Sequence, residues 1–143
     1  MHVSRIAVGD LRLVYVICAN RLIKYATGKS PIAYIGTTEK GVDRIAQSAA
    51  YRSYDILWRH GISAFDVRIV TCPPRRGIKT WRLLERAMLL AFRDKYGEIP
   101  ICNKVGTGFS EHNEFRVFAR RRITQILYDL ENSGLASGSG IET

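Results

Sequence analysis

Five residues of this chain, taken in order, have side chains that together could do polar chemistry: Tyr15, Tyr34, Arg44, Glu85 and Asn103. An arginine is a permanent fork of hydrogen-bond donors that can bind phosphate. A glutamate supplies the oxygen ligands that Mg²⁺ prefers. A tyrosine has a pKa of about 10, so it can act as a base only where nearby cations lower that pKa. If the fold brings these five side chains together, they form one candidate site.

Each of the five also has a purely structural interpretation. Strand tyrosines commonly pack within a sheet. Glu85 stands three residues after Arg82, a spacing at which two helical side chains form an ion pair. Arg44 lies near Glu39 and Asp43 in the sequence, and an asparagine such as Asn103 is frequent in turns. The elements around these residues therefore decide between the two interpretations.

The first half of the chain predicts strands that would hold the two tyrosines. Apolar runs at 11–17 and 32–35 are typical of strands, and the polar segment 20–31 predicts a hairpin connection longer than usual. The first run is almost continuously apolar, which predicts a central strand covered on both faces. A helical stripe follows from Thr38 to about Gly61, and the loose alternation over 64–71 predicts a third strand.

The second half predicts two more helices and a short strand. The pattern from Thr80 to Tyr96 is that of an amphipathic helix, which Gly97 ends. A short apolar strand at 101–102 precedes Asn103, and a last helix runs from Glu111 to about residue 130. The expected fold is α/β (α+β): a small mixed three-stranded sheet with an N-terminal antiparallel pair, flanked by helices.

Length and composition favour a single domain over residues 1–131, followed by a flexible tail rich in glycine and serine over 132–143. No apolar run approaches the ~20 residues that cross a bilayer, and the first residues lack a signal-peptide core, so a cytoplasmic protein is expected. The three cysteines include no CxxC pair, which argues against a disulfide framework and against a structural zinc site.

The charge balance points to a class of partner. Lysine and arginine total 22 against 13 acidic residues, which gives a net charge of +9. Such a surface favours polyanions, because binding neutralises phosphates and releases counterions. The residues predicted to contact nucleic acid are Gly36, Arg75, Arg76, Lys79, Arg82, Lys104, Arg120 and Arg121.

The five candidates carry a family resemblance over residues 11–104. Val14-Tyr15 and Tyr34-Ile35-Gly36 resemble the paired strands of the GIY-YIG nuclease superfamily, and Arg44 follows Tyr34 by ten residues, as in that family. Glu85 in a later helix and Asn103 after a Gly-x-x-Pro loop complete the pattern. The chain departs from it in two places: Leu13 stands where the family has glycine, and Ser48 where many members have histidine or tyrosine.

The resemblance implies a metal-dependent endonuclease that hydrolyses phosphodiester bonds by a one-metal mechanism. Tyr15, Tyr34, Arg44, Glu85 and Asn103 would be its catalytic residues, with Glu85 holding Mg²⁺ or, alternatively, Mn²⁺. DNA is the favoured substrate over RNA, with a homodimer or a partner protein supplying specificity. The sequence leaves open which tyrosine is the base. Two other functions also remain open: a catalytically inactive nucleic-acid-binding module of the same fold, and a basic protein-interaction domain.

Overall fold

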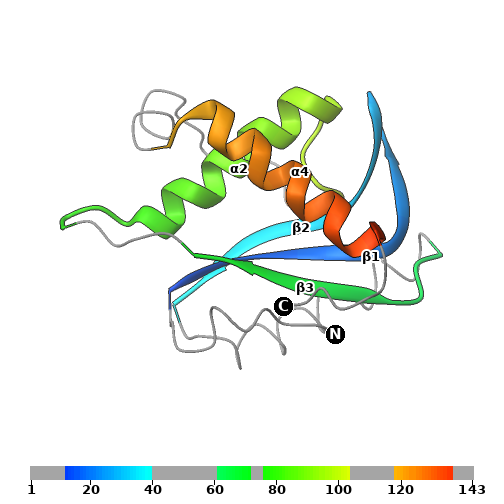
Figure 1. The fold of residues 1–143 in the computed structure, drawn as a ribbon, viewed down its shortest axis with the longest axis horizontal. Helices are drawn as coiled ribbons and strands as arrows, with labels where there is room; N and C mark the ends of the chain where they lie inside the picture. The colour runs from blue at the N-terminus through cyan, green and yellow to red at the C-terminus, as the bar shows by residue number, and fades with distance from the viewer. Residues whose placement is uncertain (1–11, 40–60, 72–75, 104–117, 137–143) are drawn as a thin grey trace.

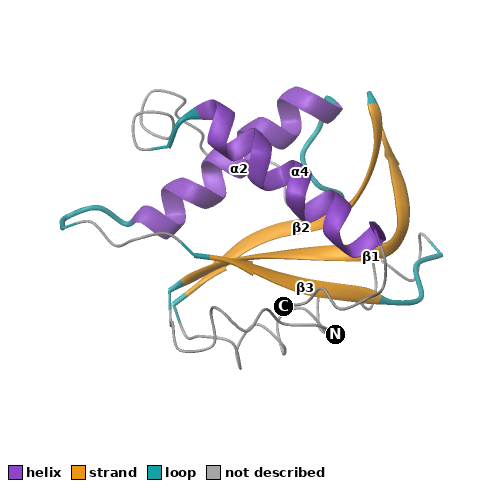
Figure 2. Cartoon of the chain, in the orientation of Figure 1, coloured by secondary structure: helices purple, strands orange, loops and turns teal. Residues whose placement is uncertain are grey.

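The computed structural model describes residues 12–39, 61–71, 76–103 and 118–136. These residues form the strands β1 (Leu13–Tyr25), β2 (Gly28–Thr38) and β3 (Phe65–Val70), and the helices α2 (Thr80–Tyr96) and α4 (Arg120–Ala136). Figure 1 shows α2 and α4 crossing over the same face of the sheet, and Figure 2 separates the two layers by colour. The helix predicted between Thr38 and Gly61 lies largely outside the described residues.

β1 is the central strand of a three-stranded sheet in the order β2-β1-β3. This confirms the predicted α+β class and the central place of the first apolar run. Both partners run antiparallel to β1, so the sheet is antiparallel throughout and not mixed as predicted. The direction of β3 depends on how the intervening chain returns to the sheet, and the residue pattern of the strand itself does not encode it.

The hairpin between β1 and β2 is much longer than predicted. The strands continue to Tyr25 and resume at Gly28, which leaves a two-residue turn where the sequence predicted a connection over 20–31. Tyr25 explains the extension, because its ring packs edge-on against Phe92 of α2 at 5.0 Å between centroids. Buried and exposed positions alternate at the end of β1, but the polar residues around Tyr25 did not indicate a strand.

Helix α2 agrees with its predicted bounds. Its buried stripe includes Trp81, Leu84, Met88 and Phe92, and Gly97 ends it in the left-handed conformation at φ 80°. The predicted strand at 101–102 is wrong, since these residues form a turn. The turn nevertheless reaches the edge of β2, where the Cys102 amide donates a hydrogen bond to the Ala33 carbonyl at 2.8 Å.

Helix α4 begins and ends later than predicted. It starts at Arg120, after Phe118 and Ala119 in non-helical conformation, whereas the predicted start at Glu111 lies outside the described residues. It ends at Ala136, so the segment predicted as a flexible tail from Asn132 begins inside this helix. None of the helices in the described part of the chain is long and apolar enough to cross a membrane.

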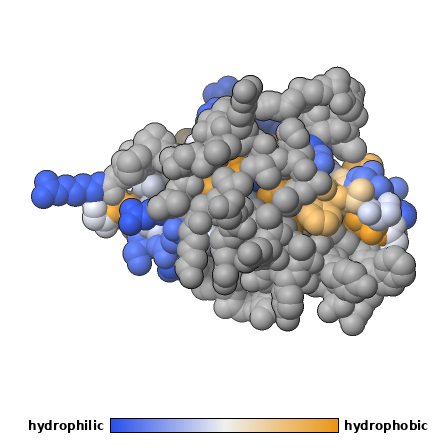
Figure 3. Space-filling view, turned by 90° about the horizontal axis from the view of Figure 1, so that it is seen from below, coloured by the Kyte–Doolittle hydropathy of each residue, from blue (hydrophilic) through white to orange (hydrophobic). Residues whose placement is uncertain are grey.

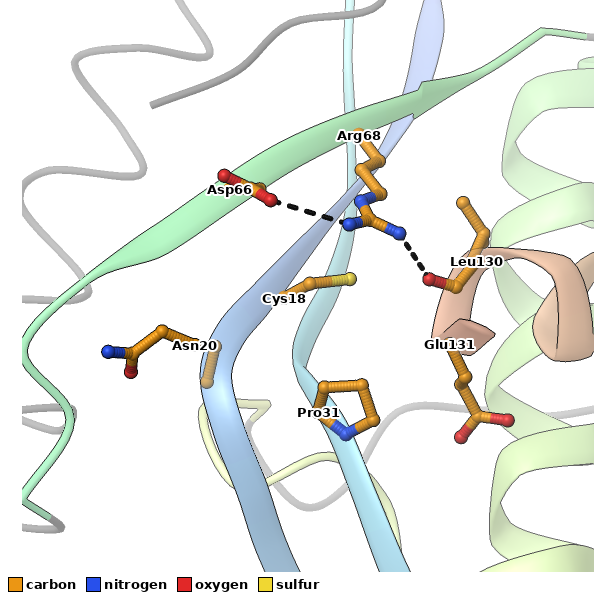
Figure 4. Close-up of a pocket in the computed structure, with 8 residues that line it drawn as sticks. Cys18, Asn20, Pro31, Asp66, Arg68, Leu130 and Glu131 are labelled. Carbon is orange, nitrogen blue, oxygen red and sulfur yellow. Dashed lines mark hydrogen bonds and ion pairs between the residues drawn. The ribbon is translucent and has the colours of Figure 1, made fainter. Parts of the chain in front are cut away.

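The end of α4 is attached to the sheet and to α2 by polar contacts. The carboxylate of Glu131, only 5% exposed, accepts hydrogen bonds from Ser30 (2.5 Å) and from the Tyr96 hydroxyl. Arg68 of β3 donates to the Leu130 carbonyl and pairs with Asp66 at 3.3 Å. Figure 4 shows Asp66, Arg68, Leu130 and Glu131 around a pocket of about 200 Å³, into which the Cys18 thiol also projects.

Two glycines allow the contribution of the α2–hairpin junction to stability to be measured. A Cβ at Gly97 would stand 3.0 Å from the Ala26 Cβ, whereas one at Gly77, at φ 74°, meets nothing within 4 Å in the described part of the chain. Alanine at either position is strained by about 1–2 kcal/mol because of the left-handed backbone. We expect Gly97→Ala to lose about 1 kcal/mol more than Gly77→Ala in urea unfolding, because of overpacking. Equal losses would contradict the tight junction.

Candidate functional site

Tyr15 and Tyr34 lie in contact on neighbouring strands. Tyr15 of β1 is paired with Gly36 of β2, and Tyr34 precedes that glycine by two residues on the same side of the strand. The ring centroids are 5.6 Å apart, with the ring planes tilted by 42°. The two rings are 3% and 9% exposed, so the packing around them fixes their positions. The structure therefore brings together the two predicted tyrosines.

Gly36 is the residue that makes this arrangement possible. A Cβ at Gly36 would lie 2.4 Å from Cε2 of the Tyr34 ring and 2.7 Å from its hydroxyl oxygen. No real Cβ tolerates such distances, so any side chain here would push the ring away. Gly36 was predicted to contact nucleic acid; in the structure it provides the space that Tyr34 fills beside Tyr15.

The tyrosine pair is on the sheet face that points away from the two helices. Val16 of β1 is paired with both Ile35 of β2 and Arg68 of β3, and Arg68 donates to the Leu130 carbonyl of α4. Val16, Ile35 and Arg68 thus face the helices. Because successive side chains along a strand alternate between faces, Tyr15 and Tyr34 point to the opposite side.

Glu85 lies on the other side of the sheet, in the second turn of α2. Its side chain is partly buried, and it forms no ion pair with any residue in the described ranges. The alternative pairing with Arg82 is not observed, since the nearest carboxylate of Arg82 in these ranges is Glu39, at 4.0 Å. Burial raises the pKa of Glu85, and the positive charges of Arg86 and Arg82 offset this only in part.

Two contacts locate the start of α2 at the same end of the sheet as the tyrosines. The guanidinium of Arg12, just before β1, lies 5.1 Å above the ring of Trp81. Arg82 reaches Glu39, just after β2. The beginning of β1, the end of β2 and the beginning of α2 therefore lie at the same end of the molecule, on the left in Figure 1. A site that uses both Glu85 and the tyrosines would form around this end of the sheet.

Asn103 is anchored to the strand beside the tyrosines. Its Oδ1 accepts a hydrogen bond from the Ile35 amide at 3.1 Å, and its Nδ2 donates to the Ile35 carbonyl at 2.8 Å. The side-chain amide thus imitates a neighbouring strand and covers the edge of β2. Its position next to Tyr34 agrees with the candidate site, while both polar atoms bind the backbone.

The basic residues predicted to contact nucleic acid separate into two groups. Arg76, Lys79 and Arg82 are exposed around the start of α2, and Figure 3 shows hydrophilic side chains projecting at this end. Arg120 instead pairs with Asp94 at 3.0 Å, about 13 Å along α2 from Glu85, and Arg121 lies next to it on α4. Arg44, Arg75 and Lys104 lie outside the described residues.

Two residues at this end were not predicted as site residues. These residues are Arg12, just before β1, and Trp81, in the buried stripe of α2. The structure places Arg12 over the Trp81 ring, and the buried indole Nε1 has no hydrogen-bond partner among the described residues. No local signal predicts this contact, because the two residues are distant in the chain.

Among the described residues, no group of three or more histidine, cysteine or acidic side chains is arranged to hold a metal ion. A hard ion such as Mg²⁺ can be held by one carboxylate, with waters and substrate oxygens as its other ligands. Glu85 fits that role, because a bound cation would stabilise the charge that burial disfavours. Comparison with protein-family models, curated proteins and solved structures found no significant match.

The contact between Gly36 and Tyr34 predicts strongly non-additive mutations. Gly36→Ala should cost about 1–3 kcal/mol of unfolding free energy, because its Cβ overlaps the Tyr34 ring. In a Tyr34→Ala background the same change should cost much less, since the overlapping ring is gone. A double-mutant cycle by urea unfolding measures the coupling. If the two losses of unfolding free energy were additive, the position of the Tyr34 ring would not depend on Gly36.

The raised pKa of Glu85 predicts a pH-dependent gain from removing its charge. The folded pKa lies above the unfolded value of about 4.3, so the folded state binds more protons and stability falls as pH rises through this interval. Glu85→Gln should therefore raise the melting temperature at pH 7, and this gain should vanish below about pH 4. Thermal unfolding at both pH values tests this. A variant less stable than the native protein at pH 7 would refute it.

Proposed function

We propose that this protein is a metal-dependent endonuclease of the GIY-YIG type that hydrolyses phosphodiester bonds in DNA. The observation that carries the proposal is the contact between Tyr15 and Tyr34 on adjacent strands, with Gly36 leaving room for the second ring. The contact explains why glycine follows Tyr34 by two residues, since a side chain at Gly36 would overlap the Tyr34 ring. The order of residue types that continues with Arg44, Glu85 and Asn103 adds support.

The tyrosine pair would handle the attacking water. Two phenols held in contact by buried packing keep their positions without reorganisation during a reaction, and such preorganisation favours catalysis. One tyrosine, deprotonated to the phenolate, would accept the proton of the water while the hydroxyl of the other orients it. Arg44, ten residues beyond Tyr34, would hold the scissile phosphate with its guanidinium.

Glu85 is the residue that would hold the divalent cation. The bound ion would supply positive charge against the phosphate and lower the pKa of a coordinated water. A carboxylate that is partly buried and without an ion pair in the described ranges is suited to this role. Asn103 would act as a positioning residue, because it fixes the edge of β2 beside Tyr34 through Ile35.

DNA is favoured as the substrate by the charge near the start of α2. Lys79 stands at the N-cap of this helix and Arg82 in its first turn, where there is no acidic residue. The N-terminus of a helix carries partial positive charge of its own, so phosphates flanking the cut would be attracted here. Specificity would come from a second copy of the chain or from a partner protein.

Cleavage of supercoiled plasmid with Mg²⁺, Mn²⁺ or EDTA tests the proposed activity. We expect metal-dependent nicking that Glu85→Ala reduces by at least about 100-fold, in line with the loss of a principal electrostatic group. Asp94→Asn is the matched control, since it removes an exposed carboxylate from the same helix far from Glu85. Mg²⁺ should also raise the melting temperature of the native protein and leave that of Glu85→Gln unchanged.

Cleavage by Glu85→Ala at the native rate, with its fold verified by circular dichroism, would remove Glu85 from the site. Binding of DNA without cleavage under any metal condition would favour the inactive binding module. Leu13 bears on this alternative, because the residue at the family's glycine position is fully buried and paired with Thr38. In this chain the side chain at that position is therefore part of the hydrophobic core.

A further inference from the structure

The hairpin formed by β1 and β2 projects beyond the third strand. β3 pairs with β1 only as far as Ala19, whereas the hairpin continues to its turn at Ala26 and Thr27. We call residues 20–31 the hairpin arm. Its base is irregular, since the pairing register shifts between Cys18 and Ile23, and such a bulge bends a strand pair. Figure 1 shows the tip of the arm beside the end of α2.

The tip of the arm is fastened to the end of α2. The Thr27 amide donates to the Tyr96 carbonyl at 3.0 Å, and its hydroxyl donates to the Lys95 carbonyl at 2.9 Å. The Ala26 amide donates to Oε2 of Glu98 at 2.7 Å. These three bonds hold the turn against the helix, so groups on the arm keep a fixed position.

The inner side of the arm is equally well packed. Ile23 and Tyr25 are buried, and the Tyr25 hydroxyl donates to the Ile32 carbonyl at 2.6 Å. Ser30, also on this side, donates to Glu131 of α4. Lys24 lies between Ile23 and Tyr25, and Lys29 lies next to Ser30. Because neighbouring side chains on a strand alternate between faces, both lysines point outward.

Lys24 and Lys29 are directly opposite each other in the strand pairing, and both are exposed. Neither forms an ion pair with any residue of the described ranges. Like charges directly opposite each other on paired strands destabilise a sheet. The fold thus holds two positive charges side by side on a fixed scaffold at a cost in stability, without an acidic partner in these ranges.

We propose that the outer side of the hairpin arm is a nucleic-acid contact in which Lys24 and Lys29 bind backbone phosphates of a DNA duplex. Two adjacent cations match the closely spaced charges of a phosphodiester backbone. Because the arm is already ordered, binding does not have to restrict a mobile loop. The net charge of +9 supplies the attraction over longer distances.

The lysine pair shares a face of the hairpin with the tyrosine pair. Tyr15 and Tyr34 point away from the helices, as do Lys24 and Lys29. Lys29 precedes Tyr34 by five residues of β2, roughly 16 Å along a strand, and the register shift between Ile17 and Cys18 adds the extra β2 residue that keeps this odd spacing on one face. If the proposed nuclease function holds, DNA would run along this face, with the arm binding about five phosphates from the cut.

The test is the salt dependence of duplex binding in EDTA, which separates the arm from any cleavage. A fluorescent DNA duplex is titrated with the native protein and with Lys24→Gln/Lys29→Gln over about 50–200 mM salt. We expect weaker binding and a slope of log affinity against log salt reduced by about 2, since each neutralised phosphate contributes about 0.9. Lys24→Arg/Lys29→Arg, which keeps both charges, should retain the native slope.

An unchanged slope in the glutamine variant would overturn the proposal. The proposal would also be overturned if the glutamine variant lost binding to polyglutamate but kept its binding to DNA. That result would favour an acidic protein partner. Because metal is absent, these outcomes do not depend on the nuclease assignment. If the native protein cuts DNA but the glutamine variant keeps the native slope, only the proposal for the arm is refuted. If the native protein never cuts DNA but the glutamine variant shows the reduced slope, only the nuclease proposal is refuted.

A charge reversal separates binding from a structural role. Lys24→Glu converts the like-charge pair into an opposite-charge pair, so the melting temperature should rise while DNA affinity falls. A purely structural role of Lys24 would move stability and affinity in the same direction. Native affinity in this variant would overturn the proposal.

Discussion

The structure depends on the burial of β1 between two strands and beneath two helices. From Leu13 to Ala19 every side chain is at most 6% exposed, which removes a continuous apolar surface from water. From Val14 to Cys18, β1 also supplies hydrogen-bonding groups to both neighbours, so neither of its edges is left unpaired there. Tyr15 sits inside this segment. Its position is therefore set by the same packing that holds the sheet together.

Polar contacts then determine where the second layer sits. A buried carboxylate such as Glu131 is costly unless donors surround it, and Ser30 of β2 and Lys95 and Tyr96 of α2 provide them. The positive charge of Lys95 is stabilised in turn, since Glu131 raises its pKa despite the opposing effect of burial. The requirement to satisfy one buried acid thus fixes the end of α4 against α2 and β2.

The candidate site and the hairpin arm differ in how they treat charge. Glu85 is disfavoured by burial, and its charge would be stabilised by a cation. Lys24 and Lys29 are disfavoured by each other and would be stabilised by an anion. Each place keeps a charge that the fold alone does not neutralise within the described ranges. A metal-assisted reaction on a polyanion would supply both partners, which links the two proposals physically.

The sequence alone was sufficient for the elements whose signals are local. The apolar run of β1, the alternation of β3 and the stripe of α2 with its glycine cap depend on neighbours a few residues away, so periodicity predicted them. The two strand motifs identified in the sequence also contained Tyr15, Tyr34 and Gly36. It could not show that Gly36 makes room for the Tyr34 ring, since that requires side-chain positions.

Only the tertiary structure decided features that join distant parts of the chain. The hairpin continues to Tyr25 because α2 offers Phe92 as a packing partner, although the local sequence is that of a loop. Asn103 bonds to Ile35, and Arg12 lies over Trp81, for the same reason. Local sequence sets backbone preference and the alternation of faces. The partner of each face is chosen by packing across the whole molecule, which no local pattern records.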